Sequence, residues 1–79
     1  MGSAKALHSV RYRAFLVRLR QARRDVGQTQ EEVAARLGRP QTWVSKCELG
    51  ERRVDFVEAV DFARLYKKSL DYFADQRRR

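Results

Sequence analysis

Residues 28–50 read QTQEEVAARLGRPQTWVSKCELG and contain two short helical patterns separated by a glycine. Thr29 stands three residues before Glu32, which is the spacing of a capping box and predicts a helix start. Gly38 can adopt the left-handed conformation that commonly ends a helix. The apolar residues between these two signals follow helical spacing: Val33, Ala34 and Leu37. We therefore predict a short helix that ends at Gly38.

A second helix is predicted to start at Pro40 and to reach about Leu49, where Gly50 stops it. Proline suits the first turn of a helix, because its missing N–H would be unpaired there. Successive helical residues are about 100° apart, so this helix has two distinct sides. The apolar side consists of Trp43, Val44 and Cys47. The opposite side gathers one amide, two hydroxyls and one ammonium, from Gln41, Thr42, Ser45 and Lys46, together with Leu49.

The polar side of this second helix carries groups that can read DNA. Glutamine can pair bidentately with adenine, serine and threonine can contact bases or phosphates, and lysine can reach guanine or phosphate. Taken alone, a polar helix face is explained equally well by exposure to water. The context favours DNA, because a helix, a glycine-containing turn and a second helix form the helix-turn-helix pattern. That pattern needs a small residue where the helices cross and apolar residues in the shared core, and Ala34, Val44 and Cys47 fit.

The segment before this stretch, residues 9–26, is predicted to be one longer helix. Its apolar residues recur at three- and four-residue spacing, at Tyr12, Phe15, Leu16, Leu19, Ala22 and Val26. Gly27 is the expected stop.

The segment after this stretch is predicted to form two more helices. Asp55 and Glu58 repeat the capping-box spacing, for a helix through about Tyr66. Ser69 can cap a last short helix. The five helices together predict a compact all-α domain. The predicted organisation is a disordered lead, the domain and a basic tail, at residues 1–8, 9–75 and 76–79.

The charge of the chain points to an anionic partner. With 18 Lys and Arg against 10 Asp and Glu, its formal net charge is +8. Residues 1–28 hold seven basic groups and one acidic group, residues 29–50 hold three of each, and residues 51–79 hold eight basic and six acidic groups. The excess thus surrounds the helix-turn-helix pattern, where it can attract DNA at long range without choosing a sequence.

Several classes of protein are excluded by composition. One cysteine and one histidine cannot complete a tetrahedral zinc site, so we expect no metal and no cofactor. No apolar run approaches the roughly 20 residues of a membrane span. The start lacks the apolar core of a secretory signal, so we expect the chain in the cytoplasm. We find no nucleophile–base pair, no clustered carboxylates and no glycine-rich phosphate loop, and so we expect no enzymatic activity.

The residues of the two short helices resemble the lambda-repressor-like, Cro-type (XRE-type) helix-turn-helix family. The stretch GERRVD at residues 50–55 is similar to that family's usual exit into its fourth helix. The resemblance covers about residues 12–73. It implies a five-helix DNA-binding domain with the helix-turn-helix in helices 2 and 3, acting in transcription control. It also implies a homodimer on a pseudo-palindromic operator of double-stranded DNA.

The resemblance assigns roles to individual residues. Reading of bases falls to Gln41, Thr42, Ser45 and Lys46. Contacts with the DNA backbone fall to Gln30, Arg39, Arg52 and Arg53. Arg23 and Glu48 match a structural ion pair between helices 1 and 3. Two departures from the family pattern stand out: Pro40 replaces a frequent Ser or Thr cap, and Tyr66-Lys67-Lys68 replaces a turn that commonly holds glycine.

Three features of the sequence leave more than one interpretation open. The indole N–H of Trp43 could reach a DNA phosphate, or the ring could cover the core. The apolar residues near the end could close the core or form a dimer seam, and they are Tyr66, Leu70, Tyr72 and Phe73. Cys47 lies among apolar neighbours, which favours an inert buried thiol over a redox sensor.

Two functions are compatible with these observations. The first is a sequence-specific DNA-binding transcriptional regulator, a repressor, that reads the major groove with its third helix as a dimer. The second is an antitoxin or other protein-interaction module of the same fold. In that case the last helix and the basic tail would hold an acidic partner protein such as a toxin.

Overall fold

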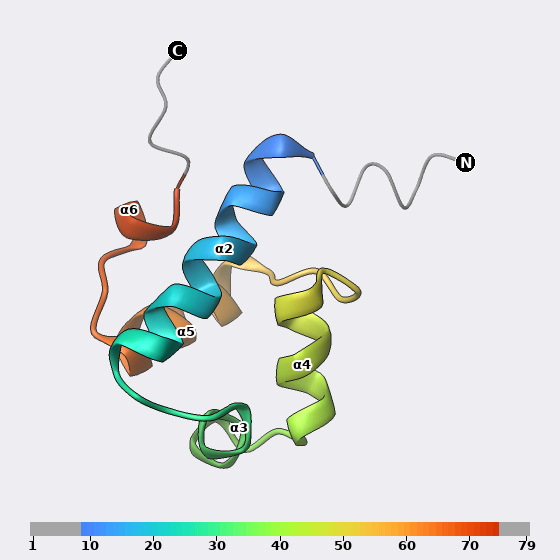
Figure 1. The fold of residues 1–79 in the computed structure, drawn as a ribbon, viewed down its shortest axis with the longest axis vertical. Coiled ribbons are helices and arrows are strands. Elements are labelled where there is room, and N and C mark those ends of the chain that lie inside the picture. Colours follow the sequence, from blue (N-terminus) through green and yellow to red (C-terminus); the bar gives the residue numbers. More distant parts are fainter. Residues whose placement is uncertain (1–8, 75–79) are drawn as a thin grey trace.

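The computed structural model of the protein describes residues 9–74, and within that range it contains five helices and no strand (Figure 1). In chain order these are α2 (Val10–Asp25), α3 (Gln30–Leu37), α4 (Gln41–Leu49), α5 (Phe56–Tyr66) and α6 (Leu70–Phe73). The predicted all-α, five-helix architecture is confirmed, and α2 to α5 begin and end within one residue of their predicted bounds. The lead predicted at residues 1–8 and the basic tail predicted at 76–79 lie outside the described residues.

Both predicted capping boxes are present. The Glu32 N–H donates to Thr29 Oγ1 at 3.1 Å, and the Thr29 N–H donates to Glu32 Oε1 at 2.9 Å. At the start of α5, the Glu58 N–H donates to Asp55 Oδ1 at 2.8 Å, and the Asp55 N–H donates to Glu58 Oε1 at 3.0 Å. Each box satisfies two backbone donors that a helix start would otherwise leave unpaired, and so it fixes where α3 and α5 begin.

The turn between α3 and α4 follows from one glycine and one proline. Gly38 ends α3 with φ 69° and ψ 34°, a left-handed conformation that few other residues adopt without strain. Pro40 lies at the N-cap of α4 with ψ 153°, one position earlier than its predicted place in the first turn. Its side chain makes no cap hydrogen bond, and its carbonyl instead accepts the Trp43 N–H at 3.0 Å.

The turn after α5 holds a lysine where the family commonly has glycine. Lys67 caps α5 in the left-handed region, with φ 58° and ψ 44°. The Lys68 N–H then donates to the Ala63 carbonyl at 2.9 Å, which closes the helix end. The helix therefore ends in the usual geometry, but a side chain with a Cβ costs about 1 kcal/mol or more there.

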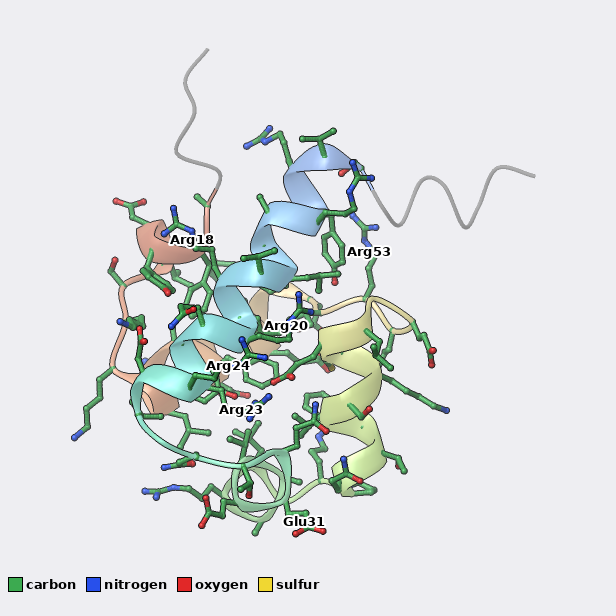
Figure 2. All side chains as sticks on the ribbon, in the orientation of Figure 1. Arg18, Arg20, Arg23, Arg24, Glu31 and Arg53 are labelled. Carbon is green, nitrogen blue, oxygen red and sulfur yellow. The ribbon has the colours of Figure 1, made fainter. Side chains whose placement is uncertain are left out.

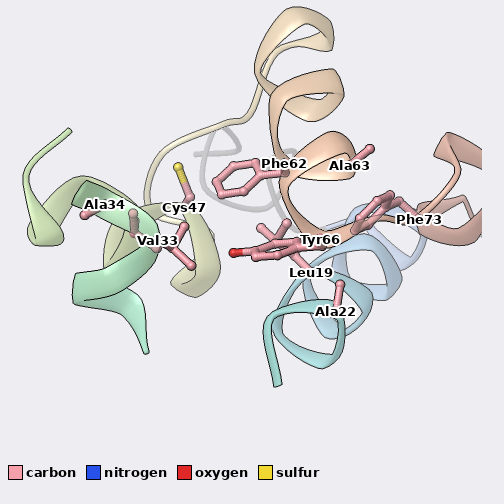
Figure 3. Packing of buried hydrophobic residues seen from close by; sticks show 10 residues of the cluster. Leu19, Ala22, Val33, Ala34, Cys47, Phe62, Ala63, Tyr66 and Phe73 are labelled. Carbon is pink, nitrogen blue, oxygen red and sulfur yellow. The ribbon is translucent and has the colours of Figure 1, made fainter. Parts of the chain in front are cut away.

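The core draws on all five helices (Figure 3). α2 packs against α4, α5 and α6, while α3 packs against α4. The buried cluster consists of Leu19, Ala22, Val33, Ala34, Val44, Cys47, Phe62, Ala63, Tyr66 and Phe73. Burial raises the pKa of the Cys47 thiol, as expected for an inert side chain in the core. The packing commits one side of α4 to the interior and leaves its other side to solvent.

Candidate nucleic-acid interface

α4 has a buried side and an outward side. Val44 and Cys47 have no exposed surface, so they anchor the helix in the core. The four side chains expected to read bases lie away from this side. Gln41, Thr42 and Lys46 are exposed, and Ser45 is half-buried. The outward side therefore presents amide, hydroxyl and ammonium groups together, on a helix whose position is set by packing.

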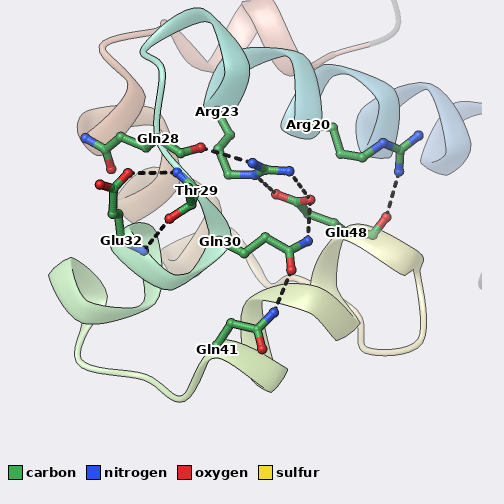
Figure 4. Close-up of polar contacts among 8 residues, drawn as sticks. All are labelled: Arg20, Arg23, Gln28, Thr29, Gln30, Glu32, Gln41 and Glu48. Atoms are coloured by element: carbon green, nitrogen blue, oxygen red, sulfur yellow. Dashed lines mark hydrogen bonds and ion pairs between the residues drawn. The ribbon is translucent and has the colours of Figure 1, made fainter.

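Gln41, the first residue of α4, is tied to the start of α3 (Figure 4). Its Nε2 donates to Gln30 Oε1 at 2.7 Å, and Gln30 Nε2 in turn donates to Glu48 Oε1 at 2.9 Å. Gln30 thus bridges an exposed amide of the outward side and a carboxylate that is buried beneath it. This bridge restricts the rotamers of both glutamines.

Glu48 and Arg23 form the ion pair at the centre of this arrangement. Arg23 Nε lies 2.6 Å from Glu48 Oε2, and Arg23 Nη2 donates to Glu48 Oε1 at 3.0 Å. Glu48 is 2% exposed, so the carboxylate depends on these donors for its charge to be tolerated. The hydrogen bond to Glu48 raises the pKa of Arg23 above its ordinary value, against the opposing effect of burial.

α2 is linked to both helices of the helix-turn-helix by two arginines. Arg23 Nη1 donates to the Gln28 carbonyl just before α3, at 3.0 Å. Arg20 Nη1 donates to the Glu48 carbonyl near the end of α4, at 2.9 Å. The sequence pattern does not reveal the role of Arg20. The only signal in the sequence is that Arg20 lies three residues before Arg23, so the two side chains are neighbours on the surface of α2.

A second charge cluster is centred on Glu58 of α5, which pairs with arginines from both sides of α4 in the sequence. Arg52 holds Glu58 through two hydrogen bonds of 2.8 Å, and it also donates to the Arg53 carbonyl at 2.8 Å. Arg39 Nη2 lies 3.7 Å from Glu58 Oε2. The Arg52 guanidinium lowers the pKa of the Glu58 carboxyl, and Glu58 raises that of Arg52. Arg52 was expected to grip the DNA backbone, but its guanidinium is already engaged within the chain.

Trp43 packs rather than reaching outward. Its ring stacks on Phe62 with centroids 5.8 Å apart and an interplanar angle of 16°. The Cζ atoms of Arg39 and Arg52 lie 4.5 and 4.9 Å from its centroid. Its Nε1 is buried and has no hydrogen-bond partner among the described residues, so in this geometry it cannot donate to a phosphate. Of the two interpretations of Trp43, this geometry favours packing of the ring over the core rather than a contact with the DNA backbone.

Basic side chains flank α4 on the neighbouring elements. Figure 2 shows Arg20 and Arg24 extending from α2 and Arg53 from the segment between α4 and α5. Arg53 is exposed, with its Cζ 4.5 Å from the centre of the Tyr12 ring. The Tyr12 hydroxyl accepts the Val54 N–H at 3.0 Å, so the same tyrosine positions the loop that carries Arg53. The structure thus leaves Arg39 and Arg53 at the surface beside α4.

The four residues considered for a dimer seam do not share one environment. Tyr66 is 1% exposed and Phe73 is 5% exposed, because both close the core of a single chain. They are therefore removed from the candidate seam. Leu70 is 40% exposed, whereas Tyr72 is half-buried against Arg18, whose Cζ lies 5.0 Å from its ring centre. Two of the four seam candidates thus belong to the interior of a single chain.

Residues 9–74 contain neither a cluster of metal ligands nor a helix that could span a membrane. No group of three or more His, Cys, Asp or Glu residues in that range could hold a metal ion. No helix of the described part is long and apolar enough to cross a membrane.

The helix-turn-helix arrangement of α3 and α4 is also found in known proteins that are similar to this chain. A family model described as a helix-turn-helix domain matches residues 14–72. The chain is also similar to a solved structure, an XRE-family like protein from Pseudomonas syringae pv. tomato str. DC3000. The two are 45% identical, the alignment covers 92% of this chain and 89% of that chain, and the TM-score is 0.78. No curated protein matches the chain.

Proposed function

The chain belongs to the XRE-type helix-turn-helix family of DNA-binding regulators, and from this premise we propose that it is a sequence-specific transcriptional repressor. It reads the major groove with the outward side of α4, as a homodimer on a pseudo-palindromic operator in the cytoplasm. Repression requires no contact other than the one with DNA, because a protein bound to the operator excludes other proteins from that site. The proposal assigns the chain no catalytic activity and no cofactor.

The observation that carries this proposal is the hydrogen-bonded chain from Arg23 through Glu48 and Gln30 to Gln41. One N–H of Gln41 Nε2 is used by Gln30, which leaves the second N–H and Oε1. Those two groups are what a glutamine needs to pair with the N7 and N6 positions of adenine. A side chain that is already oriented loses less conformational entropy on binding than a free one.

The remaining side chains divide between reading and positioning. Thr42, Ser45 and Lys46 share the outward side with Gln41 and would meet other base edges. Arg39 and Arg53, which lie at the surface beside α4, would bind phosphates and set the register. Gln30 stands at the N-terminus of α3, where backbone N–H groups favour an anion. The excess positive charge outside the helix-turn-helix would speed association without selecting a sequence.

The decisive experiment is selection of bound sites from random duplex DNA with the wild-type protein. We expect one enriched motif with dyad symmetry, whose half-sites lie about 34 Å or roughly 10 base pairs apart. A matched selection with Gln41→Ala should lose the preference at one position in each half-site and keep the rest. Recovery of no preferred motif from the wild-type selection would rule out sequence-specific reading.

A further inference from the structure

The homodimer of the proposed function needs a surface that the chain leaves open. Two of the four apolar residues near its end, Tyr66 and Phe73, are buried within one chain. Tyr72 is engaged by Arg18, which donates to its carbonyl at 3.1 Å, and by Lys68, whose Nζ lies 4.6 Å from its ring centre. Only Leu70 stays exposed in that group. A contact between two copies must therefore draw its apolar area from elsewhere.

The start of α5 offers that area. Phe56 is 70% exposed and Val57 is 67% exposed, which makes them the most exposed large hydrophobic side chains among the described residues. Val60 lies one turn further along α5 and is half-buried. The capping box of Asp55 and Glu58 explains why α5 starts here, but it does not require bulky apolar residues in the first turn. We call Phe56, Val57 and Val60 the α5 patch.

The charged residues around the α5 patch do not oppose pairing with the same patch of a second copy of the chain. The exposed charged residues further along this helix are Asp61 and Arg64, one acid and one base. The outward side of α2 also exposes valines, Val10 at 53% and Val17 at 56%, but no acidic residue stands in its first turn. Two copies that met through α2 would bring arginines against arginines, whereas the α5 patch is bordered by exposed side chains of both signs, Asp55 and Asp61 against Arg64.

We propose that the α5 patch is the surface through which two copies of the chain pair. The contact is isologous, so Phe56 and Val57 of each copy lie against the same patch of the other. This inference rests on the proposed function, because it names the partner surface of the proposed homodimer. Three apolar side chains cover much less than the roughly 800 Å² per partner of a standard interface. The dimer is accordingly weak in solution and is completed when both copies occupy adjacent half-sites.

The test is a set of single substitutions to glutamate, each placed on an exposed apolar residue. Phe56→Glu puts an acid in the first turn of α5, where the helix dipole favours it, so folding should be preserved. Val17→Glu on α2 is the matched control, with similar exposure of the original side chain. Leu70→Glu tests the competing surface at the end of the chain. Sedimentation equilibrium over a range of protein concentrations measures the dimer, and circular dichroism verifies the fold of each variant.

We expect Phe56→Glu to weaken dimerisation by about tenfold or more, because it places a charge where a central apolar side chain of the contact would be, and the few central hot spots carry most of the binding energy of an interface. Val17→Glu and Leu70→Glu should leave dimerisation unchanged. A wild-type protein that stays monomeric both in solution and on a two-half-site duplex would overturn the proposal, and so would a dimer disrupted by Leu70→Glu alone. Binding to a single half-site separates the two claims. Loss of cooperativity with half-site binding intact supports the pairing surface, whereas absence of duplex binding by every variant contradicts the proposed function only.

Discussion

Gln30 Nε2 donates a hydrogen bond to Glu48 Oε1 at 2.9 Å, and this bond joins the buried ion pair to the outward side of α4. Gln30 Oε1 accepts from Gln41, so the same side chain contacts the interior and the proposed DNA surface. The position of a side chain that we propose to read bases therefore depends on a carboxylate that is buried in the domain. We therefore expect substitutions of the buried residues of this chain of hydrogen bonds to change stability, and substitutions at its exposed end to change only the recognition of bases.

Gln41→Ala should weaken binding to the preferred operator by about 1–3 kcal/mol and relax the choice of one base pair in each half-site. The reason is that alanine removes both the donor and the acceptor that meet the base edge. Titration of fluorescent duplexes, one preferred and one changed at that position, measures the effect. Because Gln41 is exposed, the free energy of unfolding should change by less than about 0.5 kcal/mol. Equal losses on both duplexes would contradict a reading role.

Glu48→Gln should destabilise the fold by about 3 kcal/mol, because it leaves the Arg23 guanidinium without its anionic partner in a mostly buried position. Urea denaturation followed by circular dichroism gives the free energy of unfolding. Glu31→Gln is the matched control, since Glu31 is exposed at the start of α3. The control should shift stability by at most about 0.5 kcal/mol. A similar small shift in Glu48→Gln would show that the ion pair contributes little.

Arg53→Ala should weaken binding to all duplexes alike and should lower the slope of log K against log salt by about 0.9, the value of one lost phosphate contact. Arg64→Ala removes another exposed guanidinium, from α5, and serves as the control for net charge. Its slope should match that of the wild-type protein. An unchanged slope in Arg53→Ala would exclude a phosphate contact by this residue.

The acid side of the stability curve should depend on Glu58. Arg52 lowers the pKa of this carboxyl below its ordinary value of 4.5. A group with a lowered pKa in the folded state contributes its full stability above the unfolded value and loses it as the pH falls through the folded value. Wild-type stability should therefore fall more steeply below about pH 5 than that of Glu58→Gln. Denaturant unfolding at pH steps from about 7 to 3 compares the two slopes, and parallel slopes would contradict the assignment.

Local signals in the sequence were enough to predict the helices and the faces of α4. The capping boxes at Thr29 and Asp55 and the glycine at position 38 act within a few residues, so their effect can be read without knowing the fold. The partners of Arg52 and Trp43 could not be predicted in this way. Glu58 and Phe62 approach them only once α5 has packed against α4, and that depends on tertiary geometry.

The same limit applies to the end of the chain. Tyr66 and Phe73 are large apolar residues, which are found both in buried cores and in dimer seams. Periodicity alone does not show which of these two environments each residue has. Packing of α2 against α5 and α6 buries both. Phe56 and Val57 show the converse, since apolar residues in a predicted helix remained at the surface. Burial in a five-helix domain of this size is thus decided by the angles between helices, which a single sequence does not display.

Lys67→Gly should stabilise the protein by about 0.5–1 kcal/mol. Lys67 has φ 58°, and a left-handed conformation costs a residue with a Cβ about 1–2 kcal/mol more than it costs glycine. Part of the gain is offset, because glycine gives the unfolded chain more conformational freedom. Thermal and urea unfolding of the two proteins measure the difference. Arg64→Gly, placed inside α5, is the matched control and should destabilise by about 1 kcal/mol, because there glycine replaces a good helix former. Destabilisation by both substitutions would mean that the Lys67 side chain makes a contribution larger than the strain it carries.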